Sequence, residues 1–496
     1  MNPRYQRLRS FIRRVLKLYF RRISVTGLES IPTDRGGLLV AWHPNGLIDP
    51  ALIVATLPRP VCFGARHGLF QWPLLRSVLE TVGAKPIYRS QDVAADQREG
   101  QNAANQMSLD ALSRSAAEGS FATLFPEGVS HDAPHLMELK SGAARLFERA
   151  RELSPEEATQ PAIIPVGLHY DYKRLFRSNV QVSYHPPLVL TGELAKPPTA
   201  DLSDDERQER VRSLTALIEA ALHDVVHATE SWELHHLLER ARKLVRAERA
   251  RRAGRDPGPV DIKERVAGYA RVWQGYRVMN ARDPERVEGI MFDLADYEAE
   301  LRALGLEDHE LDRDPQSDSL LAPALVALQG LAVYVLFPPL LVFGVVANAP
   351  TAALLLTMAR AFGKDDKDEA TIKVAFGALL FPLTWLLVGL ATAWGVLHLE
   401  QLSWLPSRSL ASGLLAAVTS ALGGLLAVRY LRLVNETQRA LKARFLRSWR
   451  ARLVARTIDR RARLHDALIQ LVAGVDLPGQ VRPDGSIEAN SPSRGD

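Results

Sequence analysis

The sequence predicts an α/β domain, followed by a helical region and a multi-span helical membrane region. Three observations support this order. Short apolar runs alternate with helix-length stretches in residues 23–195. Charged residues dominate residues 200–312, where apolar residues recur at steps of three and four. Long apolar stretches fill most of residues 319–428.

The composition limits the classes of partner. The chain has 496 residues and a net charge of +5. A basic protein favours nucleic acid, anionic lipid or phosphorylated substrates. The sequence has no zinc-finger spacing and no aromatic run typical of RNA-binding domains, so we expect no nucleic-acid partner. The single cysteine, Cys62, excludes an intrachain disulfide, which fits a reducing compartment.

Residues 1–22 are predicted to form a basic amphipathic helix. They contain eight Lys or Arg residues and no acidic residue, with apolar residues between them. No uninterrupted apolar core follows the charges, so the segment is not a signal peptide. The spacing suits a helix that lies on an anionic membrane surface. The alternative is a helix packed on its own domain.

The α/β domain is predicted from buried strands separated by helical stretches. A loop and a helix from Pro50 follow the first strand. The predicted strands are 37–42, 120–125, 162–167 and 180–184.

Residues 200–312 are predicted to form long helical hairpins, broken at Asp256-Pro-Gly-Pro259. Their charge runs are expected to be solvated helix faces. One apolar face consists of Leu214, Leu217, Ile218 and Leu222.

The membrane region, 319–428, is predicted to cross the bilayer about four times, in two hairpins. Residues 319–362 contain no acidic residue, and their length reaches about two crossings at about 1.5 Å per residue. Pro338-Pro339 marks the expected turn, and a re-entrant hairpin is the alternative. Residues 374–397 and 410–428 give two more spans.

The flanking charges predict the orientation. Twelve Lys or Arg residues lie between positions 429 and 463, so we expect residues 429–475 to form a basic cytoplasmic helix. An even number of crossings places the N-terminal domain on the same side. The polar, Pro- and Gly-rich residues 477–496 are expected to be disordered.

The first chemical motif is His43-Pro-Asn-Gly-Leu-Ile-Asp49. An imidazole beside a carboxylate can take a proton from a hydroxyl, and the carboxylate then stabilises the imidazolium. The bland alternative for Asp49 is the N-cap of a helix that opens at Pro50.

Two further motifs could bind a substrate. Phe125-Pro-Glu-Gly128 follows a strand, where glycine lets a ligand approach the backbone and Glu127 can hold a hydroxyl. Gly83-Ala-Lys-Pro-Ile-Tyr-Arg89 and the upstream Arg66 offer guanidinium groups, whose planar donors suit a phosphate. Any single arginine could equally be a surface charge.

In this order, and with Ile164-Pro-Val-Gly167, the motifs resemble the four blocks of the PlsC-like glycerolipid acyltransferase superfamily. The five residues between His43 and Asp49 resemble the glycerol-3-phosphate/dihydroxyacetone-phosphate acyltransferase branch, whereas many members have four. So do Glu127-Gly-Val-Ser-His-Asp132 and Ile164-Pro-Val-Gly-Leu-His-Tyr170. Asn348-Ala-Pro350 and Thr371-Ile-Lys373 resemble that branch more weakly. Many members have an arginine soon after the Glu-Gly pair, where this chain has His131 and Asp132.

The resemblance implies an α/β acyltransferase domain in which His43 is the general base and Asp49 orients it. A fatty acyl group would move from a thioester, acyl-CoA or acyl carrier protein, to glycerol 3-phosphate or dihydroxyacetone phosphate at the bilayer. No metal or other cofactor is implied. The implied substrate-binding residues are Asn45, Arg66, Phe70, Arg89, Glu127, Gly128, Lys140 and Arg177.

Three other readings stay open at this point. A lysophosphatidate acyltransferase would use the same chemistry one step later. A hydrolase using Ser130 would lack the second glycine of the usual Gly-x-Ser-x-Gly turn. A non-catalytic membrane scaffold would have no need of His43.

Overall fold

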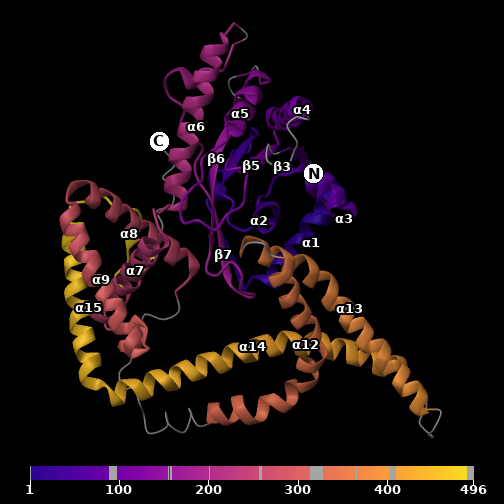
Figure 1. Ribbon diagram of the computed structural model, residues 1–496, viewed down its shortest axis with the longest axis vertical. Helices are drawn as coiled ribbons and strands as arrows, with labels where there is room; N and C mark the ends of the chain where they lie inside the picture. The colour runs from indigo at the N-terminus through magenta and orange to yellow at the C-terminus, as the bar shows by residue number, and fades with distance from the viewer. Residues whose placement is uncertain are drawn as a thin grey trace.

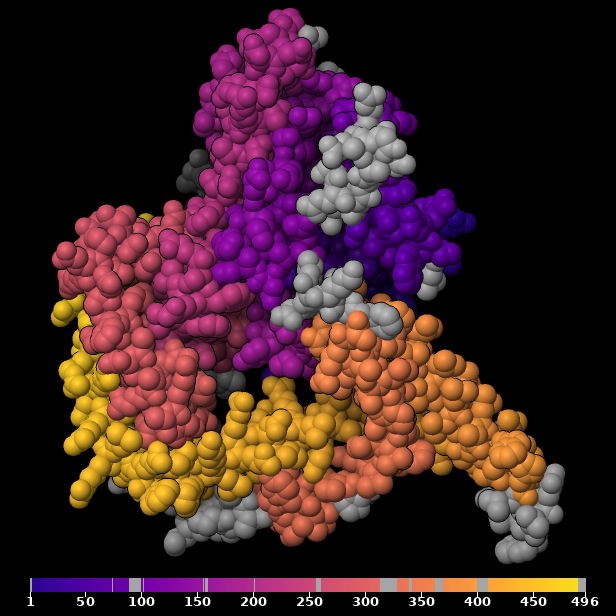
Figure 2. Space-filling view, viewed as in Figure 1, coloured from indigo at the N-terminus to yellow at the C-terminus, as the bar shows by residue number. Residues whose placement is uncertain are grey.

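The computed structural model describes residues 2–88, 98–154, 156, 159–199, 201–255, 260–312, 328–362, 366–400 and 409–488. An α/β domain lies beside a helical region, and three long helices extend away from both (Figure 1). The space-filling view shows the end of the long helices projecting beyond the rest of the chain (Figure 2).

A seven-stranded sheet forms the centre of the α/β domain. Its strand order is β1-β7-β6-β2-β5-β3-β4, and every neighbouring pair is parallel except β6 and β7. The strands are β1 Arg22–Thr26, β2 Gly37–Ala41, β3 Val61–Arg66, β4 Lys85–Ile87, β5 Phe121–Leu124, β6 Ala162–Tyr170 and β7 Asn179–Tyr184.

Helices cover both faces of the sheet. In β2, Leu39 and Ala41 point into one hydrophobic core, and Leu38 and Val40 point into another, because successive side chains of a strand alternate. The first core is closed by α1 Pro3–Tyr19, α2 Ile48–Thr56 and α3 Pro73–Thr81, and the second by α4 Arg98–Ala117, α5 Gly142–Glu152 and α6 Asp204–Val226. Short helical turns connect them at η1 Leu28–Ser30, η2 His67–Gln71 and η6 Gly192–Leu194.

The helical region consists of α7 Trp232–Arg252, α8 Ile262–Arg282, α9 Pro284–Leu304 and α10 Asp308–Leu311, together with the C-terminal α15 Ala451–Leu471. Aromatic and histidine side chains pack together where this region meets the α/β domain. Trp273 donates a 2.8 Å hydrogen bond to the Ala228 carbonyl, and the ring of His227 lies 5.5 Å from Trp273 and 5.7 Å from His169. Burial lowers the pKa of His169 to about 3, so this strand contributes a neutral ring to the junction at pH 7.

Three described helices are long and apolar enough to cross a membrane, over Leu341–Ala361, Glu369–His398 and Ser409–Trp449. They belong to α12 Phe337–Phe362, α13 Asp366–Glu400 and α14 Ser409–Trp449, and the π-helical turn η8 Ala332–Leu336 precedes α12. The predicted first crossing falls partly on residues 319–327, which lie outside the described residues.

Close backbone contacts and one buried amide hold these three helices together. A Cβ at Gly344 would lie 2.5 Å from Gly423, and one at Gly413 would lie 2.6 Å from the Gly389 carbonyl, so only glycine permits both crossings. Asn348 of α12 donates to the carbonyl of Ser420 in α14 at 2.8 Å and accepts from Trp385 of α13 at 2.9 Å. Both the amide nitrogen and the amide oxygen of this side chain therefore have hydrogen-bond partners between the apolar helices.

The structure corrects four expectations. Helix α6 carries the predicted apolar face, but Leu214, Ile218 and Leu222 pack on the sheet, so α6 belongs to the α/β domain. Pro338-Pro339 lies where the π-helical turn η8 continues directly into α12, so the chain stays helical there and makes no hairpin.

The other two corrections concern the C-terminus. Residues 429–475 are not one helix, since α14 ends at Trp449 and α15 begins at Ala451. Residues 477–488 are ordered and form the hairpin β8 Gln480–Val481 and β9 Ile487–Glu488, which turns at Pro483-Asp-Gly485. Gly485 has φ 80°, the left-handed conformation that such turns need.

Candidate active site

The predicted motifs meet at one edge of the sheet. Strands β6, β2, β5 and β3 are adjacent and parallel, so their carboxyl ends lie side by side. His43 follows β2, Glu127 follows β5, and Tyr170 ends β6. In open α/β sheets ligands bind outside these carboxyl ends, where neighbouring connections diverge.

His43 and Asp49 are in contact. The Nδ1 atom of His43 lies 2.8 Å from Oδ2 of Asp49, whose side chain is fully buried, whereas that of His43 is 15% exposed. Asp49 lies within the first turn of α2, where Leu47 is the N-cap, so it does not act as the N-cap. Nδ1 therefore carries the proton, and Nε2 is left as an acceptor that can act as a base.

Two other donors hold the buried carboxylate of Asp49. The backbone N–H of Asn45 donates to Oδ2 at 2.7 Å, and the hydroxyl of Tyr170 donates to Oδ1. Burial and the nearby charge of Asp49 raise the pKa of Tyr170 well above its usual value, so the hydroxyl remains a donor. Asn45, predicted to bind substrate, is itself fully buried and contributes this backbone donor.

Glu127 forms hydrogen bonds that hold the loop of His43. Its carboxylate accepts from the backbone N–H groups of His43 at 3.2 Å and Met137 at 2.9 Å, and lies 2.6 Å from Nε2 of His131. The N–H of Ala133 donates to Nδ1 of His131, so Nε2 of that ring carries the proton and donates to Glu127. With three protein donors and a fully buried side chain, Glu127 holds the loop of His43 in place, and its contact with a substrate stays a prediction.

Phe125 fixes the plane of the His43 ring. The two rings are stacked, with centroids 4.1 Å apart and an interplanar angle of 15°. The ring is therefore held by Asp49 at one nitrogen and by Phe125 on one face.

Gly128 and Lys140 lie on the adjoining turn. Gly128 has φ 71°, a conformation that other residues adopt only with strain, and its N–H closes the turn on the Phe125 carbonyl at 2.9 Å. Lys140 donates its N–H to the Pro126 carbonyl at 2.7 Å, and its exposed Nζ lies 3.4 Å from Glu138. Lys140 is thus a predicted substrate-binding cation that lies beside this turn.

Arg66 and Phe70 lie at the end of β3 and in η2, two strands away from His43 across β5. The ring of His67, between them in sequence, stacks on Tyr88 at 4.2 Å. Arg89, the other predicted phosphate ligand, lies outside the described residues.

Arg177 has a different place from the one predicted. Its side chain donates to the carbonyls of Lys17 and Leu18 at 3.1 and 3.2 Å, so it caps the C-terminal end of α1. A guanidinium engaged by a helix end does not form part of the group around His43.

Comparison with known proteins agrees with this geometry. The family model described as Acyltransferase matches residues 22–169, from the start of β1 into β6. Residues 22–169 form an acyltransferase domain. The match includes His43, Asp49 and Glu127 and stops one residue before Tyr170.

Two Saccharomyces cerevisiae proteins are similar over longer stretches. Glycerol-3-phosphate O-acyltransferase 2 is 28% identical over 189 residues, 38% of this chain and 23% of its own length. Glycerol-3-phosphate O-acyltransferase 1 is 24% identical over 291 residues, 57% of this chain and 36% of its own length. The chain therefore spans well under half of the length of these relatives.

The crystal structure of the 1-acyl-sn-glycerophosphate (LPA) acyltransferase PlsC from Thermotoga maritima is also similar. It is 17% identical, covers 44% of this chain and 79% of the other, and has a TM-score of 0.29.

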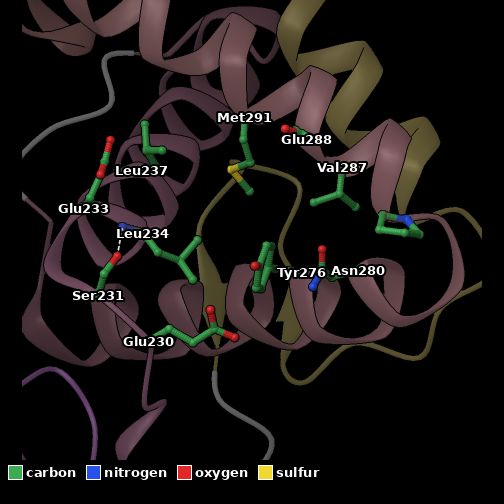
Figure 3. A pocket seen from close by; sticks show the side chains of 11 residues that line it. Glu230, Ser231, Glu233, Leu234, Leu237, Tyr276, Asn280, Val287, Glu288 and Met291 are labelled. Carbon is green, nitrogen blue, oxygen red and sulfur yellow. Dashed lines mark hydrogen bonds between the residues drawn. The ribbon is translucent and has the colours of Figure 1, made fainter.

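A pocket of about 440 Å³ lies between α7, α8 and α9, and none of its lining residues belongs to the group around His43 (Figure 3). Three glutamates line it, Glu230, Glu233 and Glu288, together with apolar side chains and no Lys or Arg. An acidic lining does not suit a phosphorylated acceptor or a CoA thioester. Within the described residues, no group of three or more His, Cys, Asp or Glu could hold a metal ion.

The structure adds three residues that the sequence reasoning had not assigned to the site. Tyr170 donates a hydrogen bond to Asp49, and His131 donates one to Glu127. Thr371 accepts one from the backbone N–H of Leu47, in the loop that follows His43. All three stood within motifs that carried the family resemblance, Thr371 in one of the weaker ones, but a single sequence does not say which residues of different motifs are in contact.

Proposed function

We propose that this chain is a membrane-bound O-acyltransferase that transfers a fatty acyl group from a thioester to glycerol 3-phosphate, with dihydroxyacetone phosphate as a further acceptor. The observation that carries the proposal is the 2.8 Å contact between His43 Nδ1 and the buried Asp49 carboxylate. It leaves Nε2 of a partly exposed imidazole as a base at the ligand-binding edge of the sheet.

The chemistry follows from that arrangement. Nε2 of His43 takes the proton of the acceptor hydroxyl as its oxygen attacks the thioester carbonyl. Asp49 stabilises the imidazolium that forms. The carbon–sulfur bond then breaks, and the proton on Nε2 passes to the departing thiolate, so the products are an ester and a free thiol. The reaction as proposed needs no metal or other cofactor.

The choice of acceptor rests on two supports. The S. cerevisiae relatives are named glycerol-3-phosphate O-acyltransferases. Two basic residues of the kind that binds phosphate also lie on this side of the domain, Lys140 beside the Gly128 turn and Arg66 at the end of β3. We propose these two, together with Arg89, as the phosphate ligands, and either acyl-CoA or acyl carrier protein as the donor.

We further propose that the acyltransferase domain and the C-terminal helices lie on the cytoplasmic side of the membrane. The twelve Lys and Arg residues between positions 429 and 463 support this, because basic residues next to a span favour the cytoplasm. A site at the interface suits an apolar acyl chain and a membrane-resident product, with polar substrates arriving from the cytoplasm.

The test is acyl transfer by the detergent-purified full chain, with palmitoyl-CoA as donor. Glycerol 3-phosphate, dihydroxyacetone phosphate and lysophosphatidate are offered in parallel, and each reaction is repeated with His43→Ala. We expect esterification of glycerol 3-phosphate and a loss of about a thousandfold in kcat in the variant, as removal of a general base costs roughly 10²–10⁴-fold.

Each other outcome changes the proposal in a defined way. Esterification of lysophosphatidate alone keeps the mechanism and overturns the acceptor. Activity that survives in His43→Ala overturns the mechanism. If the protein is inactive with both palmitoyl-CoA and palmitoyl-acyl carrier protein, the proposal fails and a scaffold role replaces it.

A further inference from the structure

In the part of the chain that the structure describes, the bonded backbone N–H groups of the loop from His43 to Asp49 find their partners within the α/β domain, with one exception. The backbone N–H of His43 donates to the Glu127 carboxylate, and the backbone N–H of Asn45 donates to the Asp49 carboxylate. The exception is the N–H of Leu47, which donates to Oγ1 of Thr371 at 3.1 Å. Thr371 lies 324 residues further along the chain, in α13.

The first turns of α13 are part of the core of the acyltransferase domain. Ala370 is fully buried among the residues that line the α1 and α2 face of the sheet, and Val374 packs against the same core. Nζ of Lys373 donates to the Arg174 carbonyl at 3.1 Å, in the connection between β6 and β7. In Figure 1 the start of α13 lies against the domain. Thr371 is therefore held firmly where it meets the loop.

The N–H of Leu47 occupies a sensitive position. Leu47 is the N-cap of α2, so its N–H has no partner within that helix. The first turn of α2 carries Asp49, which orients the His43 ring. The preceding Gly46 has φ 45° and adds a flexible point to the loop. A loop that lost its bond at Leu47 would move Asp49, and with it the base.

We propose that Thr371 is a positioning residue, through which the membrane helix α13 sets the geometry of the catalytic loop. The inference rests on the proposed function for its catalytic meaning. It implies that the acyltransferase domain is not self-sufficient, because one of its loop contacts is supplied by a helix that spans the bilayer. Residue 371 never touches substrate and acts through Leu47 and Asp49.

The kinetic test compares two substitutions at Thr371, each of which changes one of the two groups on its Cβ atom. Thr371→Val keeps the shape and removes the acceptor, whereas Thr371→Ser keeps the hydroxyl. We expect Thr371→Val to lower kcat about tenfold with KM unchanged, because small errors in placement reduce the rate more than the binding. Thr371→Ser should retain near wild-type kcat.

Thr384→Val is the matched control. It lies in the same helix, and its hydroxyl pairs with that of Thr351 in α12 at 2.6 Å, away from the loop. We expect it to lower thermal stability while leaving kcat unchanged. An equal loss of kcat in Thr384→Val and Thr371→Val, or in Thr371→Ser and Thr371→Val, would overturn the proposal.

Hydrogen exchange gives a second readout that needs no acceptor. In nanodiscs of the full chain, peptides that contain the Leu47 amide should exchange faster in Thr371→Val than in wild type or Thr371→Ser. Unchanged exchange overturns the proposal. Faster exchange in a protein that acylates nothing supports the contact and rejects the proposed function, so the two failures are distinguishable. If the valine variant does not fold, Thr371→Ala takes its place in the same comparison.

Discussion

A carboxylate that is fully buried needs hydrogen-bond donors, since burial without them is costly. At Asp49 the donors are the His43 ring, the Asn45 N–H and the Tyr170 hydroxyl. The first is the candidate base and the second belongs to the same loop. Tyr170 is the donor that comes from another strand, so it ties the catalytic loop to the sheet.

We predict that Tyr170→Phe lowers kcat by roughly 10- to 100-fold, because a hydrogen bond to a charged group contributes about 1.5–3 kcal/mol. KM should change little, since the ring remains in place. Steady-state kinetics with glycerol 3-phosphate measure both. Tyr184→Phe is the control, as it removes a buried hydroxyl that lies 2.8 Å from Thr56 in the same core. Equal values of kcat in Tyr170→Phe and wild type would show that the Tyr170 hydroxyl has no part in the reaction.

Residue-level contacts show what one sequence can and cannot predict. His43 and Asp49 are six positions apart in one loop, so their pairing could be predicted from spacing. The Tyr170–Asp49 and Leu47–Thr371 contacts join residues 121 and 324 positions apart, and local periodicity carries no information about such distances. The position of Arg177 was misjudged for the same reason, since its partners are the carbonyls that end α1.

At the scale of elements, continuous apolar runs predicted β2, β5, β6 and β7 within a few residues. The strand β1, Arg-Ile-Ser-Val-Thr, has no such run, and its place in the sheet comes from pairing with β7. An amphipathic helix has the same pattern whether it packs on a sheet or on another helix. This ambiguity is why α6 was predicted to lie outside the α/β domain.

Helix α1 combines both predicted environments. Tyr5, Leu16 and Tyr19 are buried in the domain core, whereas Phe11 and Leu18 are 58% and 44% exposed. The two exposed residues are seven positions apart and so share one face of the helix. Deleting the helix would expose the core and would not isolate membrane contact.

We predict instead that the exposed face of α1 touches the bilayer. A polarity-sensitive dye at Phe11→Cys can report this, because the native Cys62 is buried. In nanodiscs the dye should shift to the blue and be quenched by headgroup-nitroxide lipid. Met107→Cys, on α4 across the sheet and 74% exposed, is the control. If the dyes at both sites are quenched equally weakly, α1 is only a packing helix.

At the scale of the whole molecule, the C-terminal chain returns from the membrane helices to the helical region. Helix α14 leads to α15, whose Arg461 is fully buried. Its guanidinium lies 3.2 Å from Glu248 of α7 and 2.5 Å from Asp312 after α10. The long membrane helix is thus connected to the helical region through a buried ion pair as well as through the chain.

We predict that Arg461→Ala destabilises the protein by about 3–5 kcal/mol, since it removes a buried cation from Asp312 and from Glu248. Burial raises the pKa of Glu248, but hydrogen bonds from Arg251 and Arg252, and the charge of Arg461, lower it to about 2 overall. The stability from this carboxylate is therefore complete above pH about 4.5 and is lost as the pH falls towards 2.

Thermal unfolding in detergent at pH 7 and pH 4 measures both effects. The loss caused by Arg461→Ala should be largest at pH 7 and smaller at pH 4, where Glu248 in the unfolded chain is already partly protonated. Arg432→Ala is the control, because its pair with Glu436 is exposed at both partners and contributes about 1 kcal/mol or less. If the two variants unfold at the same temperature at pH 7, the buried pair does not hold α15 in place. The connection between the membrane helices and the helical region would then rest on the apolar contacts of α15 with α7 and α9.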